Sequence, residues 1–210
     1  MVAMYYYLKF IFMKKNLYFF RHGETNYNLE NRWYGCSIDT ALNDNGVEQA
    51  KTLADKVANL GMSVLYCSPL LRAVQTANVI VQRIGIDVPI VILQNLREGN
   101  FGTVEGLTFD EAYQQFGKEF VDAICWPTVQ NWDNAFPEGE TKHNIFNRVL
   151  GCLNYIIYSS EDVNVGVVCH AGVLSALKCG LGMEATPNPN CSILHLLYDM
   201  EMHTFEQIND

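Results

Sequence analysis

The sequence predicts an α/β protein, a three-layer α/β/α sandwich around a central, mostly parallel sheet. Short runs of β-forming residues alternate with longer segments whose apolar residues recur at helical spacing. One of these runs, Val163–Cys169, is apolar almost throughout, which is typical of a parallel strand covered on both faces. The chain has 210 residues, 49% of them hydrophobic and 18% charged. This is enough to bury the core of one domain of ordinary size.

The individual elements follow from periodicity and from capping residues. A first strand is predicted over Asn16–Phe20, followed by a loop over Gly23–Leu42. Asn43 is then the N-cap of a helix that Gly61 ends. Further strands are predicted at Val64–Cys67, Val88–Leu93, Val163–Cys169, Ile193–Tyr198 and Thr204–Ile208, the last two as a hairpin. Further helices are predicted from Ser68-Pro69 to Ile84 with Gly85 as the stop, and at Phe109–Phe116, Thr141–Tyr158 and Val173–Leu181.

Residues 13–210 are expected to form a single domain, because no linker divides them. Residues 1–12 are apolar and rich in tyrosine, but the stretch is too short to span a bilayer. Lys14 and Lys15 follow this apolar run, whereas a signal peptide has its lysines first. We interpret residues 1–12 as an N-terminal extension, either poorly packed or the product of an upstream start site, before a natural start at Met13.

Charge and cysteine usage limit the partners and the compartment. The formal net charge is −9, from 14 Lys and Arg against 23 Asp and Glu, which argues against nucleic acid and anionic membranes as general partners. A small anionic substrate stays possible, because a few arginines can gather in one pocket. The seven cysteines include no Cys-x-x-Cys pair, which indicates buried thiols in a reducing cytoplasm. No metal-ligand spacing is present, so we expect no metal and no cofactor; the sequence does not indicate an oligomeric state.

Ionisable residues recur where a predicted strand turns into the next element. The first strand leads into Arg21 and His22, and the second leads into a helix with Arg72 in its first turn. The strand ending at Cys169 leads into His170, followed by the Ala171 amide at a helix start. If these strands are parallel, all of these groups lie at one edge of the sheet, where α/β proteins bind ligands. Two arginines, two histidines and helix N-terminal amides suit a phosphoryl group.

This constellation suggests phosphoryl transfer through a histidine. The neutral imidazole of His22 can attack phosphorus in line, while the arginines and His170 neutralise charge on the equatorial oxygens. Glu98, on a glycine-containing loop, is the candidate acid that protonates the leaving alkoxide. No metal is required, because the arginines supply the positive charge.

Four separated motifs carry a resemblance to a known family. They are Arg21-His22-Gly23-Glu24-Thr25 with Asn28, Ser68-Pro69-Leu70-Leu71-Arg72, Leu96-Arg97-Glu98 with Phe101-Gly102 and Glu105-Gly106, and His170-Ala171-Gly172. In this order they resemble the histidine phosphatase superfamily, in the branch similar to cofactor-dependent phosphoglycerate mutase. The resemblance implies a phosphoglycerate mutase-like fold and a His22 that becomes phosphorylated. It also implies that Glu98 is proton donor and then acceptor, that Arg21, Arg72 and His170 complete the phosphate pocket, and that Asn28 contacts phosphate.

Departures from the family pattern bear on the reaction. Mutases of this branch carry Arg-His-Tyr after the acid, where this chain has Gly99-Asn100-Phe101. The segment Trp126–Gly139, a predicted active-site rim, contains no Lys or Arg. Many phosphatases of the branch have glutamine at the position of Tyr34, which is therefore a candidate substrate contact.

The function predicted from these residues is that of a metal-independent phosphomonoester hydrolase that acts on a small phosphorylated metabolite through a phosphohistidine. The alternative is a phosphoglycerate mutase-type phosphomutase, which needs the same site and must also retain an intermediate. A weaker alternative is a non-catalytic binder of phosphorylated ligands. It is disfavoured because none of the four motifs has lost its ionisable residue.

Overall fold

A computed structural model describes residues 14–84, 88–159 and 162–208. Its six strands form one sheet in the order β3-β2-β4-β1-β5-β6. The strands are β1 (Lys14–Arg21), β2 (Val64–Cys67), β3 (Ile90–Ile92), β4 (Asn164–Cys169), β5 (Ile193–Asp199) and β6 (Thr204–Ile208). The first four neighbours in this order are parallel, and β5 runs antiparallel to both β1 and β6. The predicted mostly parallel sheet and the final hairpin are confirmed, while the expectations for residues 1–12 and Gly85 lie outside the described residues.

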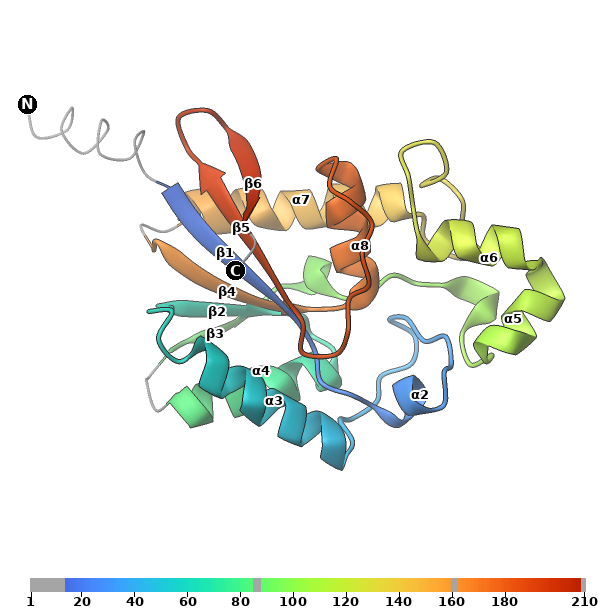
Figure 1. Cartoon of the computed structure of the whole chain (residues 1–210), viewed down its shortest axis with the longest axis horizontal. Coiled ribbons are helices and arrows are strands. Elements are labelled where there is room, and N and C mark those ends of the chain that lie inside the picture. The colour runs from blue at the N-terminus through green and yellow to red at the C-terminus, as the bar shows by residue number, and fades with distance from the viewer. Residues whose placement is uncertain (1–13, 85–87, 160–161, 209–210) are drawn as a thin grey trace, which may run out of the picture.

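Helices cover both faces of this sheet, which confirms the three-layer sandwich. Helices α3 (Asp44–Val57) and α4 (Leu71–Ile84) lie on one face, and α7 (Lys142–Ser159) and α8 (Ala171–Gly180) lie on the other (Figure 1). Each face of the sheet packs against its helices in a buried apolar cluster, and alternate side chains of β1 enter one cluster or the other. Leu17 and Phe19 join the α7 and α8 side, and Tyr18 and Phe20 join the α3 and α4 side.

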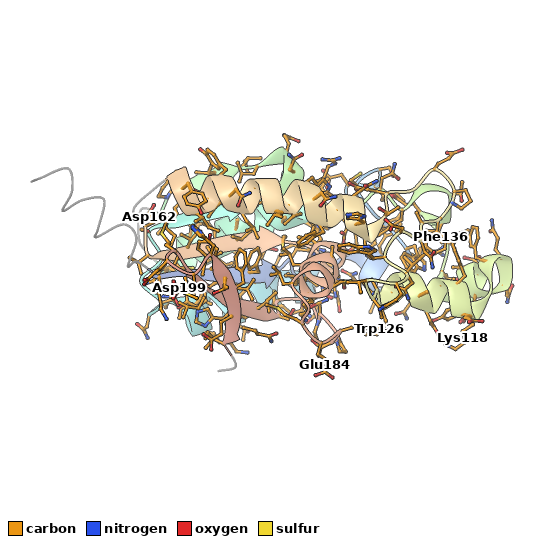
Figure 2. All side chains as sticks on the ribbon, turned by 90° about the horizontal axis from the view of Figure 1, so that it is seen from above. Lys118, Trp126, Phe136, Asp162, Glu184 and Asp199 are labelled. Carbon is orange, nitrogen blue, oxygen red and sulfur yellow. The ribbon has the colours of Figure 1, made fainter. Side chains whose placement is uncertain are left out.

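A third buried cluster lies beyond the sheet, under α5 (Phe109–Phe116) and α6 (Lys118–Cys125). Figure 2 shows this end of the molecule, marked by Lys118, Trp126 and Phe136, opposite the end marked by Asp162 and Asp199. The sequence pattern predicts α5 but not α6. Gly117, at a φ of 83°, both ends α5 and begins α6. Because the apolar residues continue across it and it has no side chain to cap a helix, the sequence does not show where α6 begins.

Some element boundaries differ from the prediction. The predicted loop Gly23–Leu42 contains the short helix α2 (Asn26–Leu29), formed because Thr25 and Asn28 exchange side-chain and backbone hydrogen bonds as a capping box. Helix α4 begins at Leu71 and not at Ser68-Pro69, because Asp39 from a distant loop accepts the N–H of Leu71 at 2.8 Å. The edge strand β3 is shorter than predicted, and 3₁₀ turns at Gln94–Leu96 and Gly102–Val104 follow it.

Within the described ranges, no helix combines the length and the apolar character needed to cross a membrane.

Candidate active site

The register of the parallel strands brings three strand ends together. Arg21 at the end of β1 pairs with Cys169 at the end of β4, and Cys67 at the end of β2 pairs with Val168. The next residues, His22 and Ser68, continue the alignment: their amides donate to the Cys169 carbonyl at 3.1 Å and to the Val168 carbonyl at 3.0 Å. The carboxyl ends of β1, β2 and β4 therefore share one edge of the sheet, as the sequence predicts.

His22 is fixed by its own backbone turn. Its Nδ1 lies 2.7 Å from the Gly23 carbonyl, which can only accept, so Nδ1 carries the proton. Burial lowers the pKa of His22 well below its ordinary value, and the charges of Arg21 and Arg72 lower it further. The ring is therefore neutral, and its Nε2 keeps a lone pair.

The turn that carries His22 packs tightly against the start of α3. A Cβ on Gly23 would lie 2.4 Å from the Gly46 carbonyl oxygen, so only glycine permits this approach of two backbones. The Gly23 amide donates to Thr76 on α4 at 3.0 Å. These contacts leave the His22 loop little freedom to move.

Arg21 and Arg72 are held by backbone carbonyls. Arg21 Nη1 donates to the Asn188 carbonyl at 2.7 Å. Arg72 is fully buried and donates to the carbonyls of Gly35 at 3.0 Å and Ile38 at 3.1 Å, with its guanidinium 4.6 Å from the centroid of the Tyr34 ring. The Nε atoms of both arginines are buried and have no hydrogen-bond partner within the described structure. Each arginine thus keeps an N–H donor for a ligand.

His170 lies beside His22, with the two ring centroids 5.1 Å apart. Its Nε2 is 2.6 Å from the Ser68 hydroxyl, and its Nδ1 is buried with no partner in the described ranges. Burial lowers the pKa of His170 well below the usual range, and Arg72, His22 and Arg21 act in the same direction. His170 is the N-cap residue of α8, and Ala171 is its first helical residue. The first amides of a helix have no carbonyl of their own helix to bond.

Glu98 is 5% exposed, and both of its carboxylate oxygens accept backbone hydrogen bonds. Gly99 donates to Oε1 and Gly172, at the start of α8, donates to Oε2, both at 2.9 Å. The loop that carries Glu98 is tied to α7 by Arg148, which donates to the carbonyls of Asn95 and Arg97 at 2.6 Å and 2.8 Å.

Glu140 completes this support, because it accepts from Arg148 at 2.8 Å and its amide donates to the Asn100 carbonyl at 2.6 Å. No sequence motif marks Arg148 or Glu140 as supporting residues. They lie far from Glu98 along the chain, and only the fold brings them under its loop.

A hydrogen-bond network fixes the amide of Asn28. Its Oδ1 accepts from the Tyr34 hydroxyl at 2.7 Å and from Asn190 Nδ2 at 3.2 Å. Thr25 donates to the Tyr34 hydroxyl at 2.9 Å, so that hydroxyl donates its own proton to Asn28. Burial raises the pKa of Tyr34, which keeps the hydroxyl protonated. The structure thus places Tyr34 under Arg72 and against Asn28, with its hydroxyl already bonded.

A cavity of about 310 Å³ adjoins these residues on the Glu98 side. Gly172 and Asn188, which bond Glu98 and Arg21, form part of its wall. Lys142 also lines it, although the rim segment Trp126–Gly139 itself contains no cation. Sequence reasoning missed Lys142; the available signal is that it lies three residues before Ile145, on the apolar stripe of α7, where a lysine is unusual.

Within residues 14–84, 88–159 and 162–208, no group of three or more His, Cys, Asp or Glu side chains is placed to hold a metal ion.

Fold and site together define an enzyme that acts on phosphate esters: two neutral histidines, two arginines with donors to spare and one carboxylate surround the carboxyl edge of an α/β sheet. The family model of the histidine phosphatase superfamily (branch 1) matches residues 17–210. The chain belongs to this superfamily and is a histidine phosphatase.

Individual relatives agree with the family assignment. The chain is 32% identical over 195 residues to GpmB of Escherichia coli, named "Probable phosphoglycerate mutase", covering 87% of this chain and 84% of GpmB. It is 28% identical over 157 residues to PhoE of Bacillus subtilis, named "Uncharacterized phosphatase", covering 75% and 72%. The solved structure of YhfR from Bacillus stearothermophilus is similar, with a TM-score of 0.80 at 27% identity and coverage of 93% and 96%.

Proposed function

We propose that the protein hydrolyses a small phosphomonoester through a phosphohistidine at His22, without a metal ion. The observation that carries this proposal is the state of His22, whose ring is neutral and whose Nδ1 proton is bound to Gly23, which leaves the Nε2 lone pair as a nucleophile. The partnerless buried atoms of Arg21, Arg72 and His170 support the same reading, because each can bind a phosphoryl oxygen.

The reaction then runs in two steps. His22 Nε2 forms a bond to phosphorus as the bond to the ester oxygen breaks, and Glu98 gives its proton to the leaving alkoxide. In the second step the Glu98 carboxylate takes a proton from water, the water oxygen bonds to phosphorus and the phosphorus–nitrogen bond breaks. Inorganic phosphate leaves, and Glu98 is protonated again.

The direct test is to trap the intermediate. Wild-type protein mixed with a phosphomonoester and quenched without acid should carry one labile phosphate on His22 by mass spectrometry, and His22→Ala should have no turnover. His203→Ala is the matched control, because His203 is an exposed residue next to β6, and it should keep normal activity. A chelator should leave the wild type active, because the arginines hold the charge. Phosphate on another residue, or normal turnover in His22→Ala, would refute the mechanism.

A phosphomutase is the second candidate, and Lys142 favours it. A mutase must grip both ends of a doubly anionic intermediate, and Lys142 places a cation in the cavity beside the site. The name printed for GpmB points the same way. The measurement is the ratio of phosphate released to 2-phosphoglycerate formed from 3-phosphoglycerate with a bisphosphoglycerate primer. We expect release of phosphate to dominate, and dominant isomerisation would promote the mutase.

We also propose that the protein works in the cytoplasm on a dissolved metabolite. All seven cysteines are free thiols, as expected of a reducing compartment. The excess of acidic residues over basic ones supports a small substrate over nucleic acid.

A further inference from the structure

Lys142 occupies an unfavourable position for a lysine. It is 5% exposed. Among the described residues, its ammonium has no hydrogen bond and no ion pair within 4 Å. The ammonium lies over the ring of Phe101, whose centroid is 5.0 Å from Nζ. Lys142 is also the first residue of the 18-residue helix α7, where the positive end of the helix dipole repels a cation. Burial and the helix dipole act against a charge at this position, and the cation–π contact with Phe101 offsets only part of this cost.

The surroundings of Lys142 indicate what would compensate these costs. The cavity of about 310 Å³ that it lines is at the lower end of the range for small-molecule sites. Five aromatic side chains form most of the remaining wall: Trp33, Phe101, Phe109, Tyr113 and Trp126. Among the described residues that line this cavity, Lys142 is the one cation.

The nearby charge of Glu98 favours the charged form of Lys142. Glu98 does not, however, form a hydrogen bond with the ammonium. Both Glu98 oxygens accept backbone amides, from Gly99 and Gly172. The ammonium therefore keeps its donors for a group inside the cavity. Because Gly172 and Asn188 belong both to the cavity wall and to the contacts of Glu98 and Arg21, a molecule in the cavity lies beside the candidate phosphate site.

We propose that Lys142 is a specificity-determining residue that binds a carboxylate on the leaving group of the substrate. The substrate class is a phosphomonoester whose alcohol part has an aromatic or otherwise flat apolar body with one carboxylate. A carboxylate fits better than a second phosphate, since one lysine balances a single negative charge, whereas a phosphate dianion calls for several donors. The inference rests on the proposed hydrolase function and adds the chemical class of its substrate.

The test compares two synthetic substrates that differ by one carboxylate group, phenyl phosphate and 4-carboxyphenyl phosphate. Wild-type protein should prefer the carboxylated ester by at least about tenfold in kcat/KM, as expected for one buried hydrogen bond between charged groups. Lys142→Met should bring this ratio close to one, mainly through KM for the carboxylated ester. Lys142→Gln is the second variant if the methionine variant folds poorly.

Lys118→Met is the matched control. Lys118 also lies 5.0 Å from an aromatic ring centroid, that of Tyr113, but it is exposed and paired with Asp122. Lys118 contacts Tyr113 of the wall but does not itself line the cavity. The variant therefore removes the same charge from outside the cavity and should keep the wild-type preference.

Binding of the non-hydrolysable phosphonates separates the two hypotheses. Calorimetry should show that wild type binds 4-carboxyphenylphosphonate more tightly than phenylphosphonate, and that Lys142→Met loses the difference. No preference in wild type, or a preference that survives in both Lys142 variants, would overturn the inference while leaving the hydrolase intact. No hydrolysis of either ester would overturn the proposed function, and the phosphonate affinities would then decide the role of Lys142 by themselves.

Discussion

The hydroxyl of Ser68 should decide which nitrogen of His170 carries the proton. Ser68 Oγ accepts the Leu70 amide at 3.3 Å, and we expect it to donate its own proton to His170 Nε2 at 2.6 Å. The neutral ring must then hold its proton on Nδ1, the buried atom that has no partner within the described structure. His170 would thus present a neutral N–H donor to the phosphoryl group, and Ser68→Ala removes what selects that tautomer.

The expected magnitude follows from this single hydrogen bond. Loss of a buried partner that leaves a polar atom unsatisfied costs about 1–3 kcal/mol. A loss of about 2 kcal/mol in transition-state stabilisation corresponds to about a 30-fold fall in kcat/KM. The same unsatisfied nitrogen should lower the melting temperature by about 6 °C in a chain of this length.

The assay is steady-state hydrolysis of an aryl phosphate together with thermal unfolding. Ser63→Ala is the control, because the exposed Ser63 makes a comparably short hydrogen bond, to Asp162 at 2.6 Å, far from the site. Ser63→Ala should change neither quantity measurably. A Ser68→Ala variant within twofold of wild type in kcat/KM would refute the tautomer argument, even if its stability fell.

Three more predictions follow from the geometry of the site. Gly172→Ala should lower kcat by about 100-fold, because the new Cβ would lie 2.4 Å from Glu98 Oε1 and displace the carboxyl group; Gly151→Ala, with nothing within 4 Å, is the control and should remain active. Glu98→Gln should slow alkyl phosphates far more than activated aryl phosphates, whose departure needs little protonation, and an equal loss on both would exclude Glu98 as the acid. Stability should fall as pH drops below about 6.5, because the unfolded chain then binds protons that the buried, neutral His22 and His170 do not, by up to about 1.4 kcal/mol per pH unit for each histidine. Urea unfolding of His22→Gln should show a shallower acid slope, and an unchanged slope would contradict the lowered pKa.

The sequence predicts the sheet and the meeting of its strand ends well, because both depend on local patterns. The apolar run before His170 and the short runs before His22 and Ser68 are strong strand signals, and parallel strands place their carboxyl ends together. Once the strands are predicted, the positions of Arg21, Arg72 and the two histidines near the strand ends predict that these side chains lie close together.

The remaining features depend on contacts between distant segments. Ser68 reads as a helix cap in the sequence, yet its hydroxyl lies against His170, 102 residues away. Asp39 caps α4 from across a loop, so no pattern near Leu71 reveals the helix start. Lys142 follows a rim without cations, and only the packing of α7 turns its side chain toward Phe101 and the cavity.

The aromatic cluster under α5 and α6 means that the candidate catalytic residues and the cavity wall are supported by different buried cores. The candidate site residues Arg21, His22 and His170 lie at strand ends between the two cores of the sheet, whereas Trp33, Phe101 and Phe136 belong to a third core. Substitutions in that third core can reshape the cavity while the strand ends keep their register. In evolution, substitutions in this third core can therefore change which substrates fit while the catalytic residues stay in place. The same core is a suitable place for engineered changes of specificity.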